Sequence, residues 1–360
     1  MNHRTTHDAH DRPLLRWVSR RSLLAAGLVG LAGCSGAPGL QPPVGTNAPA
    51  EGTPVQPTSA DGLPRNRFAA PGSVQSTIDE AAAGGYSRVY LHPETEYRPK
   101  RTWEVKRGVT LDYNGAHVRV TRNVDVHDIQ PGGQVVDPVV DLRHVTGRYT
   151  SSVFVFDSRR HGFYGNNRLW HVVGGITRGR TGEGTVFEFA QGGESSLYFV
   201  HVDHAVWRAG TVVDMHRGDA FGINGVHVYG LWYGFETGIR MRNRSPPGRN
   251  VDNISGNQFE VIAQPNDSRI LWDLEVGRFN VLRGKLWDFG DYSDVMWRIH
   301  AADAEARIGN VLHWFPVGGT EQSLLNGTAA TGVFDDRLGD DRNRVVIPWL
   351  QGYPVGSFGG

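Results

Sequence analysis

The chain has 360 residues, and its 47 glycines, 19 prolines and 39 % apolar residues argue against a helix bundle or a coiled coil. Its 37 Lys and Arg balance its 37 Asp and Glu; residues 1–34 hold five Arg and two acids, so the remainder has 32 basic and 35 acidic residues, a net charge of −3. A nucleic-acid partner therefore has no electrostatic support.

The first 34 residues have the pattern of an export signal. A basic lead with the pair Arg20-Arg21 precedes an apolar run from Leu23 to Gly33, which is too short to span a bilayer. This start resembles a twin-arginine signal, and the four residues that end at Cys34 resemble a prokaryotic lipobox. The resemblance implies a lipid on Cys34 and anchoring on the extracytoplasmic face of a prokaryotic membrane. A buried N-terminal helix is the alternative.

Residues 35–66 contain seven prolines and five glycines, and Cys34 is the only cysteine of the whole chain. The segment lacks the large apolar residues that a core needs, so we expect a disordered tether between the anchor and a folded domain. The domain can form no internal disulfide, because the one thiol is the predicted lipid attachment site.

The folded part begins with a short amphipathic helix. Ser73 is a candidate cap, Val74, Ile78 and Ala81/Ala82 form one apolar stripe, and Gly84-Gly85 ends the helix. Beyond it the apolar residues alternate with a period of two, which predicts many short strands. The alternating pairs are Val89/Leu91, Trp103/Val105, Val109/Leu111 and Val118/Val120.

A loose repeat follows, in which a small polar residue precedes apolar residues at the second and often the fourth position. Its anchors are Asn167, Ser195, Asn224, Asn257, Asn280, Asn310 and Asn343. A second apolar strand follows 15 to 20 positions later, at Phe187, Val213, Ile239, Trp272 and Trp297. Because strand side chains alternate, each anchor shares the inward face with its apolar followers, and stacked Asn side chains are expected to form a hydrogen-bonded ladder.

This pattern resembles right-handed parallel β-helix proteins of the pectate-lyase superfamily, which includes polygalacturonases and phage tailspikes. The resemblance is most specific from the helix at Ser73 to about Thr121, through Val89-Tyr90-Leu91-His92-Pro93 and Arg107-Gly108-Val109-Thr110-Leu111. It implies an all-β solenoid with a capping helix over residues 67–318 and a loop-rich segment with a possible last coil over 319–360. An antiparallel Greek-key sandwich is the alternative fold.

Outward positions of the registered strand are the candidate functional residues. The third residue after each anchor has the opposite parity, and the resulting stripe is Trp170, Tyr198, His227, Glu260, Arg283 and His313. Aromatic rings suit sugar faces, so Trp170, Tyr198 and His313 are expected to bind substrate. In an eliminative lyase, Arg283 would neutralise a uronic carboxylate, with Glu260 or His227 as the base. A solvated polar face is the alternative interpretation.

We therefore expect a surface lipoprotein that binds an extracellular polysaccharide or glycan, with cleavage by a lyase or a hydrolase left open. A non-catalytic structural or adhesive protein is the competing hypothesis, and the oligomeric state is undetermined. Metal-ligating residue types gather at His201, Asp203, His204, Asp214, His216 and Asp219 without a zinc spacing, so no metal site is assigned. No cofactor is required by any motif, and calcium at Asp288, Asp291 and Asp294 remains an option.

Overall fold

The computed structural model describes residues 66–84, 87–165, 170–192, 195–218, 222–243, 254–264, 270–287, 295–299, 309–317, 334–336 and 343–346. All of them belong to one compact unit, Val55–Gly360. The predicted signal, with Cys34, and the predicted tether up to residue 65 lie outside the described residues. Over the described ranges, no helix is long and apolar enough to cross a membrane.

The described chain is mostly β-structure, arranged in rows of strands. The first row consists of β1 (Asn66–Ala69), β2 (Arg88–Leu91), β5 (Thr110–Asp112), β8 (Gln134–Val136), β11 (Trp170–Arg178), β14 (His201–Arg217), β16 (His227–Asn243), β18 (Gln258–Gln264), β20 (Val281–Trp287), β22 (Val311–Val317) and β24 (Arg344–Val346). The second row consists of β3 (Glu96–Tyr97), β6 (His117–Arg119) and β9 (Val139–Asp141), and it continues into the end of β11.

The third row consists of β4 (Trp103–Val105), β7 (His127–Ile129), β10 (Ser152–Asp157), β12 (Thr185–Gln191), the second halves of β14 and β16, β19 (Ile270–Leu274), β21 (Val295–Ile299) and β23 (Phe334–Asp336). A separate small sheet contains β13 (Leu197–Tyr198), β15 (Ile223–Asn224) and β17 (Ile254–Ser255). The two helices of the described chain are α2 (Val74–Gly84) and α3 (Ser158–His161).

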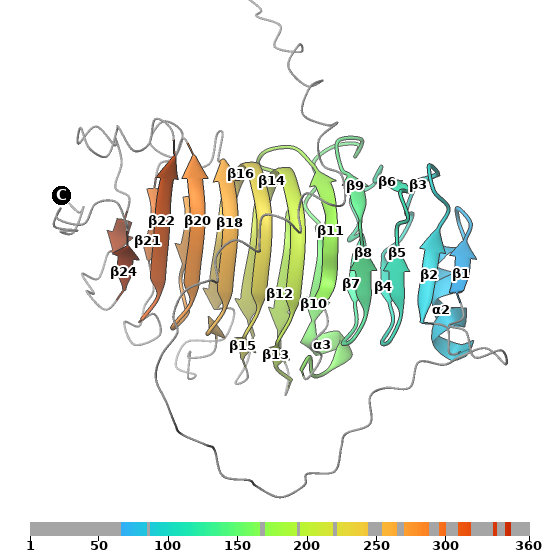
Figure 1. Ribbon diagram of the computed structural model, residues 1–360, viewed down its shortest axis with the longest axis horizontal. Helices are drawn as coiled ribbons and strands as arrows, with labels where there is room; N and C mark the ends of the chain where they lie inside the picture. Colours follow the sequence, from blue (N-terminus) through green and yellow to red (C-terminus); the bar gives the residue numbers. More distant parts are fainter. Residues whose placement is uncertain are drawn as a thin grey trace, which may run out of the picture. The chain divides into compact units, whose positions relative to one another are not determined.

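Neighbouring strands of these rows run parallel, as Figure 1 shows for the arrows from β2 to β22. All pairings between the named strands of the described chain are parallel, which does not fit the antiparallel Greek-key alternative. The all-β prediction is confirmed, and the long parallel sheet is compatible with a solenoid. Strands β23 and β24 extend the pairing into the 319–360 segment.

Helix α2 lies at the end of the rows where the described chain begins (Figure 1) and contacts β1, β2 and β4. Its buried residues are Val74, Thr77, Ile78 and Ala81, so the apolar stripe is confirmed except for Ala82, which is exposed. The Ser73 carbonyl accepts from the Thr77 N–H at 2.9 Å, while the Ser73 hydroxyl donates to the Ala70 carbonyl at 3.0 Å.

The core consists of inward residues that repeat from strand to strand. In the first row, Val89, Leu111, Val135, Val172, Val202, Val228, Phe259, Leu282 and Leu312 occupy one register position and are fully buried. The second predicted strand is confirmed residue by residue, since Phe187, Val213, Ile239, Trp272 and Trp297 are in register in the third row. The Trp272 and Trp297 rings stack with centroids 4.7 Å apart, close to the spacing between strands.

A ladder of buried asparagines runs beside this core from Asn257 to Asn343. The Asn257 Nδ2 donates to Asn280 Oδ1 at 2.9 Å, Asn280 donates to Asn310 at 2.9 Å, and Asn310 donates to Asn343 at 3.0 Å. Each of these Nδ2 groups also reaches a backbone carbonyl, of Ile223, Ile254 or Gly277. The predicted inward Asn ladder is therefore confirmed over these four residues.

The ladder does not include the earlier anchors of the predicted repeat. Asn224 is in register with Ser255, and the position equivalent to Asn257 is Val226, whose N–H donates to Asn257 Oδ1 at 2.9 Å. The prediction that Asn224 is the rung preceding Asn257 is therefore wrong by two residues. Ser195 precedes β13 of the small sheet, and Asn167 lies outside the described residues.

Candidate functional site

The outward side of the first row carries the candidate site. Residues Asp203, Tyr229, Glu260, Arg283 and His313 are in register on five successive strands, and we call this set the outer column. Each of them follows a fully buried inward residue, such as Val228 before Tyr229. Since side chains alternate along a strand, the outer column faces away from the core, with neighbouring layers about 4.8 Å apart.

Three of the six predicted site residues are brought together as expected. Glu260 is in register with Arg283, and Arg283 is in register with His313. The remaining residues lie elsewhere. A second outward column precedes the outer column by two residues on β14 and β16. It consists of Trp170, His201 and His227, which are in register on β11, β14 and β16, and we call it the histidine column.

Tyr198 lies in the small sheet, in register with Asn224, so the single six-residue stripe is wrong. The physical reason is that two predicted anchors do not lie at the rung positions, which are Val200 and Val226. Ser195 precedes its rung by five residues, which places Tyr198 on β13, and Asn224 precedes its rung by two, which displaces His227. A shift of two residues keeps every side chain on the same face of the strand but moves it by one position along the strand.

Aromatic rings link the histidine column to the outer column. The Trp170 ring lies 5.4 Å from the His201 ring and 5.3 Å from the Tyr229 ring, and His201 lies 4.7 Å from His227. Trp170 is 38 % exposed, which leaves part of its surface available to a ligand.

The same face continues with exposed aliphatic and aromatic residues farther along the strands. Leu231 and Ile262 are in register and exposed, and the Trp207 and Tyr233 rings stack at 4.1 Å. The face is thus aromatic and apolar on β11, β14 and β16 apart from Asp203, and it carries the charged residues Glu260, Arg283 and Lys285 on β18 and β20.

Burial shifts the titration of several groups on this face. It lowers the pKa of His201, with a further contribution from His227, and it lowers the pKa of His227 against the opposing charge of Glu260. Burial followed by the charge of Arg283 lowers the pKa of His313, and burial raises the pKa of the Asp203 carboxyl. The three imidazoles are therefore held in the neutral form near pH 7, in which a ring nitrogen can accept a proton.

Sequence reasoning missed a second set of outward residues, on the third row. Glu188, Asp214, Arg240, Asp273 and Arg298 are in register on successive strands, and we call them the polar ladder. Each of them directly follows one of the correctly predicted inward residues, from Phe187 to Trp297, so the alternation already held the signal.

The members of the polar ladder are bound to one another or to adjacent side chains. Arg240 Nη2 donates to Asp214 Oδ2 at 3.0 Å, and Arg298 Nη2 donates to Asp273 Oδ2 at 3.0 Å. Glu188 accepts from the Ser152 hydroxyl at 2.6 Å and contacts His216 Nε2 at 2.7 Å. These contacts satisfy buried or half-buried charges, which points to a stabilising role.

The metal-ligating residue types near His201 are separated in the structure. His204 is buried and contacts Thr177 Oγ1 and the Gly174 carbonyl, whereas Asp214 binds Arg240 and His216 binds Glu188. In the described chain no three His, Cys, Asp or Glu side chains gather as a metal site would require. Asp219 and the candidate calcium ligands Asp288, Asp291 and Asp294 lie outside the described residues.

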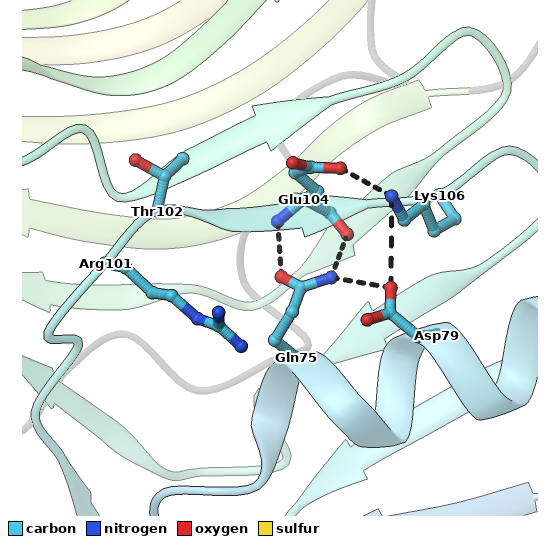
Figure 2. Close-up of a pocket in the computed structure, with 6 residues that line it drawn as sticks. All are labelled: Gln75, Asp79, Arg101, Thr102, Glu104 and Lys106. Atoms are coloured by element: carbon cyan, nitrogen blue, oxygen red, sulfur yellow. Dashed lines mark hydrogen bonds and ion pairs between the residues drawn. The ribbon is translucent and has the colours of Figure 1, made fainter.

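A polar pocket of about 220 Å³ lies between α2 and β4 and is drawn in Figure 2. Gln75 donates to Asp79 and to the Glu104 carbonyl and accepts from the Glu104 N–H at 2.7 Å. Lys106 binds Glu104 at 2.5 Å and lies 3.9 Å from Asp79. The polar groups that line the pocket bind one another across the contact between α2 and β4, so these interactions hold α2 against the strands.

No family model, curated protein or solved structure matches the chain. The candidate site is therefore defined by the residues of the outer and histidine columns alone.

Proposed function

We propose that the chain is a right-handed parallel β-helix protein that binds an extracellular polysaccharide on the outward side of its first strand row. The parallel rows and the Asn ladder support the β-helix, because both require equivalent residues to stack layer upon layer. The resemblance to the pectate-lyase superfamily supports the same architecture.

The observation that carries the binding proposal is the combination of rings and charges on one face. Trp170, His201 and Tyr229 form a connected aromatic cluster, and the outer column continues on the next strand with the charged Glu260. Aromatic faces stack on the apolar sides of sugar rings, while carboxylate, guanidinium and imidazole groups bind hydroxyl and carboxylate substituents. Equivalent positions repeat along the row, which suits a polymer with a repeating unit.

The register of Glu260 with Arg283 favours eliminative cleavage as the second step of this function. Arg283 would neutralise the carboxylate of a uronic residue, and this acidifies the adjacent C–H. Glu260 or His227 would take that proton, a carbon–carbon double bond would form as the bond to the glycosidic oxygen breaks, and the departing oxygen would take a proton from solvent. His313 would bind the sugar beside Arg283. A non-catalytic adhesive or structural protein is the alternative, and it uses the same face without turnover.

Attachment to the membrane completes the proposal. The lipobox at Cys34 and the Pro- and Gly-rich segment 35–66 support a lipid anchor with a tether that presents the domain outside a prokaryotic cell.

Binding of the purified chain to a panel of neutral, uronic and sulfated polysaccharides tests the proposal. We expect Trp170→Ala and Tyr229→Ala to weaken binding about tenfold each, because a stacking surface is lost at an outward position. Phe68→Ala removes an exposed ring on β1, five strands from β14 in the row, and is the matched control. Binding that is absent from the panel, or unchanged in both variants, would refute the proposal.

A further inference from the structure

A turn with left-handed backbone precedes the first row in five successive layers. Its residues are Phe199, Gly225, Gly256, Phe279 and Gly309, with φ angles of 54°, 63°, 64°, 54° and 70°. Each turn leads from the small-sheet side of a layer into the first-row strand of that layer. The residue directly after the turn is Val200, Val226, Asn257, Asn280 or Asn310. Glycine adopts this backbone without strain, whereas a bulky side chain rarely does.

Two of the five layers nevertheless carry phenylalanine, and both rings are largely exposed. Phe199 is 51 % exposed and Phe279 is 58 % exposed. Burial of the rings in the core therefore does not explain why these strained positions hold large apolar residues. Backbone strain that persists at an exposed position is a common mark of function.

Each ring lies over the glycine of the following layer. A Cβ added to Gly225 would lie 3.0 Å from Cδ1 of Phe199, and one added to Gly309 would overlap the Phe279 ring. A Cβ added to Gly256, the turn residue between the two pairs, would have no atom within 4 Å, so the space beside this glycine is open. The two phenylalanines are three layers apart, or about 14 Å at the usual strand spacing.

A polar column runs beside the rings. Tyr198, Asn224, Ser255 and Arg278 are in register, and they alternate with the buried residues Leu197, Ile223 and Ile254. Phe163, which is 47 % exposed, adds an edge contact with Tyr198 at 5.6 Å between centroids. Ring faces next to hydroxyl, amide and guanidinium groups are the two kinds of contact that a sugar polymer needs.

We propose that this corner is a second carbohydrate-binding track, in which Phe199 and Phe279 stack against pyranose rings of a chain that runs across the layers. The corner is continuous with the candidate face, because Phe199 is two residues before His201 on the same segment of chain. The proposal rests on the polysaccharide-binding function above. The ligand class is a polymer rather than a monosaccharide, since one sugar cannot reach two rings about 14 Å apart.

The test uses the double variant F199G/F279G in the full chain, with oligosaccharides of graded length from the polymer that the parent binds. Affinity for the long chains is expected to fall about tenfold while short oligosaccharides that fill only the outer and histidine columns bind as before. Thermal stability is expected to stay equal or rise, because glycine relieves the left-handed strain. The variant F199A/F279A removes the same rings without that relief and should lose affinity equally; Phe68→Ala is the exposed-ring control.

Three results would overturn the corner proposal while leaving the function of the face intact. The first is unchanged affinity for long chains in both double variants. The second is a large loss of stability in F199G/F279G with normal binding, which would make the rings a cover for the glycines. The third is unchanged glycan affinity with lost binding to phosphatidylcholine–phosphatidylglycerol vesicles, which would make the corner a membrane-contacting surface. A parent chain that binds no polysaccharide would instead refute the proposed function itself.

Discussion

The side-chain amide of Asn257 and its backbone N–H both donate to the same oxygen, Oδ1 of Asn280, at 2.9 and 3.1 Å. The next pair, Asn280 and Asn310, repeats this arrangement with the same distances. One amide oxygen therefore replaces a backbone acceptor at the turn and also links two layers.

Removing an internal rung should measure the contribution of the ladder. Asn280→Leu leaves the Asn257 N–H and Nδ2 without their shared acceptor, and the expected loss is about 1–3 kcal/mol of unfolding free energy. Urea denaturation followed by circular dichroism is the measurement. Gln258→Leu changes an exposed residue beside the ladder and is the control. Equal stability of Asn280→Leu and the parent would contradict a stabilising ladder.

Buried histidines predict a loss of stability in acid. Burial lowers the pKa of His127 from 6.5 to about 3 and that of His204 from 6.5 to about 4. At a pH between the folded and the unfolded pKa of each histidine, the unfolded chain binds more protons than the folded chain. The contribution of each buried neutral histidine to stability is therefore fully present above about pH 6.5 and is lost as the pH falls toward its folded pKa. The expected slope is about 1.4 kcal/mol per pH unit for each histidine.

The variant His127→Phe should make that acid slope shallower by one histidine. The new ring can still stack on Phe154, although Tyr113 loses the 2.8 Å contact of its hydroxyl with His127 Nε2. Comparing slopes rather than absolute stabilities removes this second effect. The exposed His117→Phe should leave the slope as it is, and a slope in His127→Phe that equals the parent's would show that His127 does not titrate with unfolding.

The polar ladder predicts a charge effect at Asp214. Asp214 is 5 % exposed in its side chain and accepts hydrogen bonds from both Arg240 and Arg242. Asp214→Asn should destabilise the fold by about 1.5–3 kcal/mol, because two guanidinium groups lose their shared carboxylate. Denaturation at low and high salt is the measurement, and Glu96→Gln, at a more exposed ion pair with Arg98, is the control. An effect no larger than that of the control would indicate a solvated pair.

Eliminative cleavage should depend on Arg283 more than on Lys285, two residues farther along β20. Arg283→Ala is expected to reduce the formation of an ultraviolet-absorbing unsaturated uronide about 100-fold, with a small change in binding. Lys285→Ala removes an exposed charge outside the outer column and should retain most turnover. Equal rates in the two variants would indicate that Arg283 is a solvated surface charge without a role in turnover. Release of reducing ends without the absorbance would indicate hydrolysis instead.

Lipid attachment predicts a specific phenotype for Cys34→Ser. This variant lacks the only thiol of the chain, so the protein should appear in the soluble fraction or accumulate as an unprocessed precursor. Membrane fractionation and labelling with a radioactive fatty acid are the measurements. Retention of the label by Cys34→Ser would refute the lipobox assignment.

Much of the fold could be predicted from periodicity alone. The inward residues of the second strand, from Phe187 to Trp297, and the four Asn rungs from Asn257 to Asn343 could be found because each layer repeats the same polar-to-apolar spacing. The all-β class follows from the same alternation.

The register before Asn257 could not be read from the sequence. Asn224 and Val226 lie on opposite sides of the left-handed Gly225, and a two-residue spacing in a strand does not tell which of them is the rung. Hydrogen bonds settle the choice, because Asn224 Oδ1 accepts from the Ser255 hydroxyl at 2.7 Å while the Val226 N–H reaches Asn257. The same uncertainty displaced His227 from the outer column, whereas Tyr198 was displaced because Ser195 lies five residues before the rung position at Val200.

Strand partners in the rows are close in sequence: Phe259 pairs with Leu282, and Leu282 pairs with Leu312. In the rows of the described chain each strand pairs only with the strands directly beside it, so the stability approximates a sum of layer terms and nearest-neighbour coupling terms. Folding can then start at any layer and propagate in both directions. Hydrogen exchange should consequently report one opening free energy for the Asn-linked layers β18 to β22 and a separate one for the layers around His127 on β7. A destabilising substitution in one of these two groups of layers should weaken the other only through the layers between them.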